Sequence, residues 1–312
     1  MPKILAVIDP EHTEHLALTR IKELPTEGFV FQIEFFMPKT FSAQDATGFT
    51  KEMGKIGDAL NLLVKPLIDL GYNIETQITL FDRLYEAIIE RAEACNVDYV
   101  FKPLRHHGAL SRSLFTPTDW NLVRMCPCPT LFISQQPSVN KLPVLASVDV
   151  ANNDKDHKEL NEIVINQSRV IAGLIGADVH LANAYDMMTG AIGGPMPDPT
   201  AYQMVQSRRQ EHVKEAGAMA KAHDIPEAQV HLSEGPADRV INRFAEKIGA
   251  GIIVVGTVAR SGIAGLFIGN TAESLIENSD CDVFVVKPSS FKSPVTGKST
   301  TSTIDPKGYT AT

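Results

Sequence analysis

VVGTVARSGIAGLFIGNTAESL, residues 254–275, joins three kinds of sequence in one short stretch. An apolar run comes first, a loop with four glycines follows, and the stretch ends in a helix-like segment. Asn270 stands where that helix would begin and Glu273 follows three residues later, which is the capping-box pattern of a helix N-terminus. The order of apolar run, glycine loop and capped helix predicts a strand–loop–helix unit of an α/β sheet.

The chain contains two copies of one unit. The sequence ILAVIDP at 4–10 recurs as VLASVDV at 144–150, an offset of 140 residues. At the other end of each copy, CPTLFI at 128–133 aligns with CDVFVV at 281–286, an offset of 153 residues. This internal similarity predicts a tandem duplication, and the difference between the offsets indicates an insertion of 13 residues in the second copy. The Gly- and Pro-rich stretch at 186–200 has no counterpart in the first copy and is its expected position.

The repeat divides the chain into two domains and a tail. We expect a first domain at 1–135, a second domain at 141–290 and a C-terminal tail at 291–312. The polar stretch SQQPSVNKL at 134–142 contains a proline and is the expected linker. The tail is rich in Ser, Thr and Lys and has almost nothing to bury, so we expect it to be disordered.

Apolar strand-like runs alternate with segments of helical period in both copies, which is the pattern of a parallel sheet covered by helices. Each copy is therefore expected to be a five-stranded, doubly wound α/β domain with strand order 3-2-1-4-5. Ligands of such sheets bind at the carboxyl ends of the strands, at the switch point between strands 1 and 4. Strands are expected near 3–8, 29–36, 73–80, 97–101 and 130–134 in the first copy, and near 143–148, 178–184, 229–233, 251–255 and 282–287 in the second. Helices are expected near 118–125 in the first copy, and near 155–175, 201–223, 236–248 and 271–278 in the second.

The composition limits the classes of partner. With 312 residues, 44% hydrophobic and 21% charged, the chain is typical of a globular protein with a real core. A formal net charge of -8 leaves no excess of Lys and Arg for a phosphate backbone, so we expect no nucleic-acid partner. The first apolar stretch, 4–8, is too short for a signal peptide and no run could span a membrane, so we expect a cytoplasmic protein. The four cysteines are too few for a disulfide framework and are expected to be packed thiols.

The glycine loop could hold an anion at the start of the last helix. Gly256 leaves the strand where a side chain would crowd a ligand, and Gly269 directly precedes the helix. Free backbone N–H groups and the helix dipole at such a start suit a phosphate group. Further donors would come from Arg260 and from the hydroxyls of Thr257, Ser261 and Thr271. The alternative is that the glycines only provide the turns that any strand-to-helix loop needs.

The stretch 254–288, together with LASVDV at the start of the second copy and the tandem duplication, resembles the universal stress protein family over both copies. The nucleotide motif of that family is Gly, two residues, Gly, nine residues, Gly, and then Ser, Thr or Asn. The matching positions here are Gly256, Ala259, Gly269 and Asn270, so the spacing is kept while the second glycine is alanine. If that position needs a positive φ, alanine costs about 1 kcal/mol or more.

The resemblance implies that the second copy binds an adenine nucleotide, ATP. In nucleotide-binding members of the family the acidic residue after strand 1 faces the adenosine, and Asp149 matches it here. The end of strand 2, near Asn183, would form the adenine wall. The nucleotide-site residues expected on this basis are Asp149, Asn183, Gly256, Thr257, Ala259, Arg260, Gly269, Asn270 and Thr271.

The first copy lacks this motif. At the offset of 153 residues, the four motif positions are occupied by Pro103, His106, Thr116 and Pro117. Proline removes an N–H where a phosphate would need one, so we expect no nucleotide in 1–135. Asp9, after the first strand, is expected to cap the strand end rather than to contact a ligand.

Two other interpretations stay open. The stretch 186–204 contains four methionines and could line a cavity for a hydrophobic metabolite. The protein would then be a binding scaffold that has lost nucleotide binding. The simpler interpretation is a long connection that covers its own core. His180 and His231 are expected on neighbouring strands, where they could meet as metal ligands or as a hydrogen-bonded pair. Because two ligands do not make a structural metal site, we favour the pair.

The sequence favours binding over catalysis. The loop lacks the Lys-Ser/Thr ending of P-loop NTPases, and no carboxylate in 254–275 precedes the helix cap to act as a base or metal ligand. The resemblance implies a stress-response protein whose conformation or choice of partner responds to a bound nucleotide, and slow ATP hydrolysis is left open. Each copy keeps an apolar fifth strand, at 130–133 and 283–286, that would otherwise be an exposed edge. The resemblance implies that the copies pair through these strands as an intramolecular pseudo-dimer, with a homodimer as the alternative.

Overall fold

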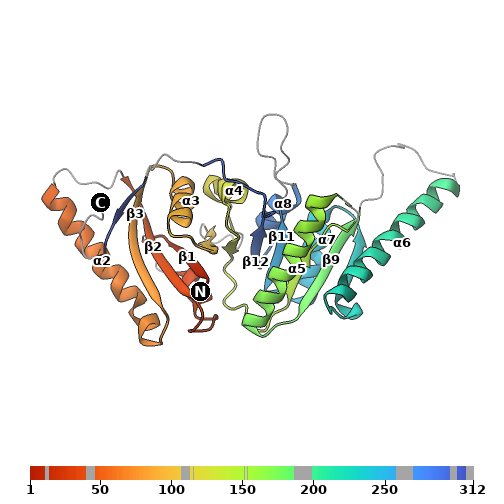
Figure 1. Cartoon of the computed structure of the whole chain (residues 1–312), viewed down its shortest axis with the longest axis horizontal. Coiled ribbons are helices and arrows are strands. Elements are labelled where there is room, and N and C mark those ends of the chain that lie inside the picture. The colour runs from red at the N-terminus through yellow and green to blue at the C-terminus, as the bar shows by residue number, and fades with distance from the viewer. Residues whose placement is uncertain are drawn as a thin grey trace. The chain divides into compact units, whose positions relative to one another are not determined.

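The chain divides into two compact units (Figure 1). The computed structural model describes residues 1–10, 14–39, 46–106, 113–114, 116–150, 152, 154–185, 199–257, 270–295 and 301–306. The first unit comprises Met1–Ser138 with Phe291–Thr312, and the second comprises Val139–Ser290. The division after Ser138 falls inside the linker expected at 134–142.

The first unit is built on a parallel sheet. Its five parallel strands are β1 (Lys3–Ile8), β2 (Val30–Pro38), β3 (Ile74–Phe81), β4 (Tyr99–Pro103) and β7 (Thr130–Ile133). They follow the order β3-β2-β1-β4-β7, and β13 (Ser302–Ile304) is added antiparallel on the outer side of β3. The helices are α1 (Leu16–Ile21), α2 (Ala46–Asp69), α3 (Leu84–Ala94) and α4 (Pro117–Met125). A small antiparallel pair is formed by β5 (Arg105–His106) and β6 (Ser113–Leu114).

The second unit repeats this arrangement. Its parallel strands are β8 (Val144–Ser147), β9 (Val179–Tyr185), β10 (Val230–Glu234), β11 (Ile252–Gly256) and β12 (Asp282–Val286), in the order β10-β9-β8-β11-β12. The helices are α5 (Lys155–Ile175), α6 (Pro199–Ala222), the 3₁₀ turn η2 (Glu227–Gln229), α7 (Ala237–Ile248) and α8 (Asn270–Asn278). In both units the described parallel strands therefore lie in the order 3-2-1-4-5, and the α/β class with a mostly parallel sheet is the one that the sequence predicts.

The central strands are buried on both faces. Successive side chains of a strand point to opposite faces of the sheet, yet β1 is buried at every position from Ile4 to Ile8 and β11 from Ile252 to Val255. This is why these strands read as continuous apolar runs rather than as alternating patterns. Two helices of the second unit end at a glycine with positive φ, Gly176 at 67° after α5 and Gly249 at 64° after α7, which an L side chain would disfavour.

Part of the tail is ordered, contrary to the expectation of disorder for 291–312. β13 pairs with β3, where Ile304 lies opposite Ile78 and is only 3% exposed (Figure 1, dark blue). The chain then passes so close to α2 that a Cβ on Gly57 would collide with the backbone of Pro306. Without β13, β3 would be the open edge of the sheet, so this short segment, of which Ile304 is the buried residue, covers an edge that would otherwise be free to pair with another chain.

Neither a disulfide nor a membrane-spanning helix is found in the part of the chain that the structure describes. All four cysteines are free thiols, and Cys126 and Cys281 are buried. Burial raises the pKa of the Cys281 thiol to about 12, so this thiol stays protonated at neutral pH. Cys126 and Cys281 are therefore packed thiols, whereas Cys95 and Cys128 are partly exposed.

Candidate functional site

Asp149 lies where the strand order of the second unit reverses. It follows β8, which pairs with β9 on one side and with β11 on the other. Asn161 of α5 fixes its backbone: Asn161 Oδ1 accepts from the Asp149 N–H at 3.0 Å, and Asn161 Nδ2 donates to the Asp149 carbonyl at 2.8 Å. Asp149 itself is exposed. A buried amide thus holds this residue at the edge where ligands of doubly wound sheets bind.

Asn183 of β9 lies beneath this edge rather than on it. Its side chain is only 1% exposed, its Nδ2 donates to the carbonyl of Val148 at 3.0 Å, and its Oδ1 lies 2.8 Å from Nδ1 of His212. Since that amide oxygen can only accept, Nδ1 of His212 is the donor. Both ends of the amide are therefore engaged within the protein. Asn183 is placed to support the end of β8, and its buried side chain does not offer a face to a base.

His212 of α6 is the residue of this cluster that sequence reasoning missed. It is 8% exposed, and its ring lies 5.2 Å from the ring of Tyr185, measured between centroids. Burial lowers the pKa of the imidazole, although the nearby carboxylates of Asp149 and Glu211 oppose that shift, so the ring is neutral at pH 7. The signal in the sequence is a stripe at every fourth position, His212, Ala216 and Ala220, which is the buried side of α6.

Gly256 and Thr257 have packing roles of their own. A Cβ on Gly256 would lie 2.5 Å from Cγ of Leu160 in α5, so the absence of a side chain is required by the helix that packs on the strand. Thr257 is buried, its N–H donates to the carbonyl of Val286 at 2.9 Å, and its hydroxyl lies 3.4 Å from the same oxygen. The space expected to be kept clear for a ligand at Gly256 is occupied by Leu160.

The rest of the expected phosphate site falls outside the described residues. This applies to Ala259, Arg260, Ser261 and Gly269. Asn270 and Thr271 open α8, but their side chains, like that of Glu273, also lie outside what the structure describes. Residues 186–198, most of the insertion expected at 186–200, also lie outside the described residues. The structure therefore describes the surroundings of Asp149, and the nucleotide site as a whole stays a prediction.

In the first unit the corresponding helix start is closed by its own cap. Thr116 Oγ1 accepts from the backbone N–H of Asp119 at 3.3 Å, and Asp119 Oδ2 accepts from the backbone N–H of Thr116 at 2.8 Å. Pro117 occupies the first helical position and has no N–H. The start of α4 therefore has fewer free backbone N–H groups that could bind an anion, because the cap uses the N–H of Asp119 and Pro117 has none.

His180 and His231 meet, as their positions on neighbouring strands predict. Nδ1 of His180 lies 2.8 Å from Nε2 of His231, and the two rings are parallel within 2°. Burial lowers the pKa of both rings, and the ring of Phe244 packs 5.3 Å from that of His231. No group of three or more His, Cys, Asp or Glu side chains that could hold a metal occurs among the described residues. The contact is a hydrogen-bonded pair between neutral imidazoles.

The fold and this edge define a class of protein: a tandem pair of doubly wound α/β domains in which the second keeps a polar residue fixed at the strand-order reversal. The comparisons with known proteins agree with that class. Residues 150–287 match the universal stress protein family. Universal stress protein E of Salmonella typhi is 31% identical over 304 residues, which covers 94% of this chain and 96% of the relative. The chain belongs to the universal stress protein family.

Solved structures align with most of the chain. A protein from Pseudomonas aeruginosa PAO1 aligns with a TM-score of 0.74 and 29% identity, covering 93% of both chains. A universal stress protein from Archaeoglobus fulgidus DSM 4304 aligns with a TM-score of 0.63 over 92% of this chain and 98% of its own. At 17% identity the second likeness shows the fold alone.

Proposed function

We propose that the chain is a stress-response protein that binds an adenine nucleotide, ATP, in its second unit. The observation that carries the proposal is Asp149, an exposed residue whose backbone Asn161 fixes at the carboxyl end of β8. Carboxylates at this edge of doubly wound sheets can accept hydrogen bonds from ribose hydroxyls. The loop that follows β11 in the sequence keeps the nucleotide spacing of the family, which supports a phosphate site next to that sugar site.

In this proposal the sugar lies against Asp149 and the phosphates lie at the start of α8. The donors for the phosphates would be Arg260, Thr271 and the backbone N–H groups around Gly269 and Asn270. Asn183 and His212 do not contact the nucleotide in this proposal. Their mutual hydrogen bond, together with the bond from Asn183 to the carbonyl of Val148, holds the end of β8 in place. Gly256 and Thr257 fix the direction in which the loop leaves the sheet. Gly256 packs closely against Leu160, and the N–H of Thr257 donates to the carbonyl of Val286.

We infer binding rather than rapid turnover. No carboxylate stands between Gly256 and the expected cap of α8, so the loop brings neither a base nor a metal ligand to the phosphates. Occupancy of the site would then change the conformation of the loop or the choice of partner. Slow hydrolysis of ATP is compatible with the proposal and would show as release of inorganic phosphate over hours.

We also infer that the two units pair through their fifth strands as a pseudo-dimer. β7 and β12 each end the order of parallel strands within their own unit, and both are entirely apolar except at their first residue. An exposed apolar edge strand invites pairing with another strand, and a short linker allows the pairing within one chain. Separately expressed halves should associate when mixed. If the halves stay monomeric and indifferent to each other, the inference is wrong.

Calorimetry of the full-length chain with ATP tests the nucleotide proposal. Asp149→Asn should weaken binding about tenfold, as expected for a lost charge-assisted hydrogen bond. Asp156→Asn, an exposed residue in the first turn of α5, is the matched control and should bind like the native chain. Ala259→Gly restores the second glycine of the family motif and should keep or strengthen binding.

No heat with ATP from either the native chain or Ala259→Gly contradicts the proposal. A hydrophobic species that co-purifies in that case would favour the metabolite-binding alternative. Met188→Asp and Met196→Asp should then release it, because they place a charge among apolar side chains.

A further inference from the structure

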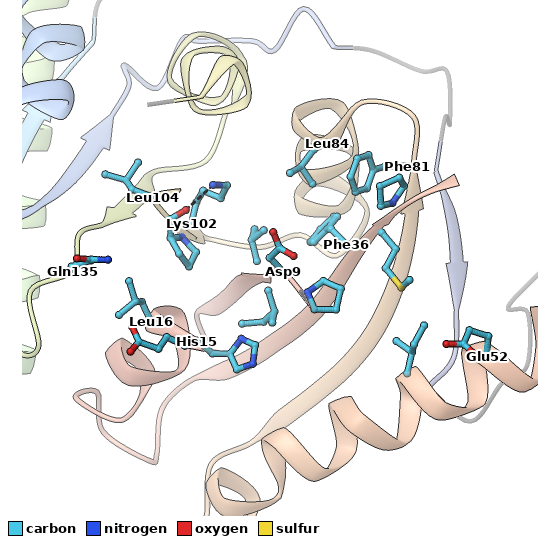
Figure 2. A pocket seen from close by; sticks show the side chains of 18 residues that line it. Asp9, His15, Leu16, Phe36, Glu52, Phe81, Leu84, Lys102, Leu104 and Gln135 are labelled. Atoms are coloured by element: carbon cyan, nitrogen blue, oxygen red, sulfur yellow. Dashed lines mark hydrogen bonds between the residues drawn. The ribbon is translucent and has the colours of Figure 1, made fainter. Parts of the chain in front are cut away.

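The first unit contains a cavity of about 410 Å³ at the carboxyl ends of its strands (Figure 2). Cavities that hold small molecules have volumes of roughly 300–1,000 Å³. This one lies where ligands of doubly wound sheets bind, in the unit that has lost the glycine loop. Asp9, expected only to cap the end of its strand, is one of its lining residues. A ligand here would have to be held by means other than a phosphate loop.

Apolar side chains make up most of the lining. In Figure 2, Phe36, Phe81 and Leu84 lie on one side of Asp9, and Leu104 lies on the other. Phe81 and Leu84 are partly exposed even though they are large and apolar. Exposed apolar surface around a concavity is what an apolar ligand would remove from water. The body of the ligand is therefore expected to be hydrophobic.

The strand ends around the cavity are poor in hydrogen-bond donors. Pro10 follows β1, Pro38 ends β2 and Pro103 ends β4, and all three line the cavity. Proline has no N–H, so the backbone lacks a donor at each of these places. A phosphate or carboxylate would find little of the backbone binding that it finds at a glycine loop.

The charges of the lining are predominantly negative. Three lining residues carry carboxylates, Asp9, Glu14 and Glu52, of which Glu52 forms an ion pair with Lys55 at 3.2 Å, and one carries an ammonium group, Lys102. Lys102 is 5% exposed and already engaged: its Nζ donates to the carbonyl of Pro103 at 2.7 Å and lies 3.0 Å from Oδ1 of the buried Asp119. The balance of charge therefore attracts a cation and repels an anion.

We propose that the first unit binds an apolar organic amine in this cavity. The hydrophobic body packs against Phe81 and Leu84, and the ammonium group lies towards Asp9 and Glu14. This site is separate from the nucleotide site proposed for the second unit, in its position and in the charge of its ligand.

Three probes with one carbon skeleton test the proposal: 4-phenylbutylamine, 4-phenylbutanol and 4-phenylbutanoate, each titrated into the full-length chain by calorimetry. The amine should bind at least about tenfold more tightly than the carboxylate, with the alcohol between them, because the three probes share a carbon skeleton and their head groups are positive, neutral and negative. Saturating ATP should leave the affinity for the amine unchanged. If the chain does not bind ATP, the nucleotide proposal fails but the affinity for the amine is unaffected. The two proposals can therefore fail independently.

Variants locate the site. Leu84→Ser should weaken all three probes, whereas Leu62→Ser, an exposed apolar residue of α2 outside the lining, should weaken none. Asp9→Asn and Glu14→Gln should each reduce the preference for the amine over the carboxylate several-fold, and Asp58→Asn, exposed on α2 and outside the lining, should preserve it. Circular dichroism confirms that each variant is folded.

Four results would overturn the proposal: no binding of the amine by the native chain, equal binding of the carboxylate, displacement of the amine by ATP, or an unchanged preference in both carboxylate variants.

Discussion

Gly256→Ala tests whether packing, rather than a ligand, requires this glycine. The added Cβ would lie 2.5 Å from Cγ and 2.6 Å from Cδ2 of Leu160, whereas carbon atoms in good contact are about 3.5–4.0 Å apart. Leu160 is 5% exposed in α5, so it cannot turn into solvent without leaving the core. Forced overpacking costs about 1–3 kcal/mol. We expect the free energy of unfolding of the second unit to fall by that amount with no ligand present.

Urea unfolding followed by circular dichroism measures the loss, and the fluorescence of Trp120, the single tryptophan, follows the first unit as an internal control. Leu160→Ala alone should cost about 2–5 kcal/mol. The double variant should lose about 1–3 kcal/mol less than the two single losses together, because the colliding atoms are gone. Strict additivity, or a Gly256→Ala chain as stable as the native one, would refute the packing argument.

Three further predictions concern the tail, the histidine pair and the loop. Ile304→Ala should lower the free energy of unfolding of the first unit by about 2 kcal/mol, seen in tryptophan fluorescence, and an unchanged midpoint would show that β13 does not protect the edge. Burial lowers the pKa of His180 and His231, so the unfolded chain binds more protons below about pH 6.5; stability should be full above that pH and fall below it. Thermal unfolding at pH 7.5 and 5.5 checks the sign, and replacing both rings by Gln should shrink the difference. Gly269→Val should abolish ATP binding in calorimetry without changing the melting temperature; retained binding would exclude this loop as the phosphate site.

The sequence predicts the limits of a helix best where a capping residue marks each of its ends. The helix expected at 155–175 is α5, with the same limits. Asp154 caps its start by accepting from the backbone N–H of His157 at 2.9 Å, and Gly176 ends it in the left-handed conformation. Such signals depend on the chain within a few residues of the end, so no tertiary information is needed to place them.

The polar contacts at the site lie beyond that kind of reasoning. The bond between Asn183 and His212 joins residues on β9 and α6, and it depends on how the helix packs on the sheet. Periodicity gives the buried face of α6 but not the partner of a polar residue on that face. Likewise, the polar composition of the tail conceals that Ile304 has an open sheet edge to cover.

The two units keep the same backbone arrangement at the place where the ligands that we propose for them differ. Pro103 pairs with Ile133 in the parallel register of the first unit, and Gly256, 153 residues later, pairs with Val286 in the second. Proline fits there because it ends the strand and need not donate to the ladder. The exchange of proline for glycine therefore leaves the sheet intact.

The residue that follows keeps the same hydrogen bond in both units. The N–H of Leu104 donates to a fifth-strand carbonyl at 2.9 Å, and the N–H of Thr257 donates to the equivalent carbonyl at 2.9 Å. The side chains nevertheless differ: Leu104 lines an apolar cavity, whereas Thr257 leads into a loop rich in glycine. Since the backbone keeps the same hydrogen bond in both units, we expect the ligand preference of each unit to depend on the donors, volume and charge that these few side chains add or remove. Occupancy of the two sites should therefore be independently adjustable, an amine in the first unit and ATP in the second.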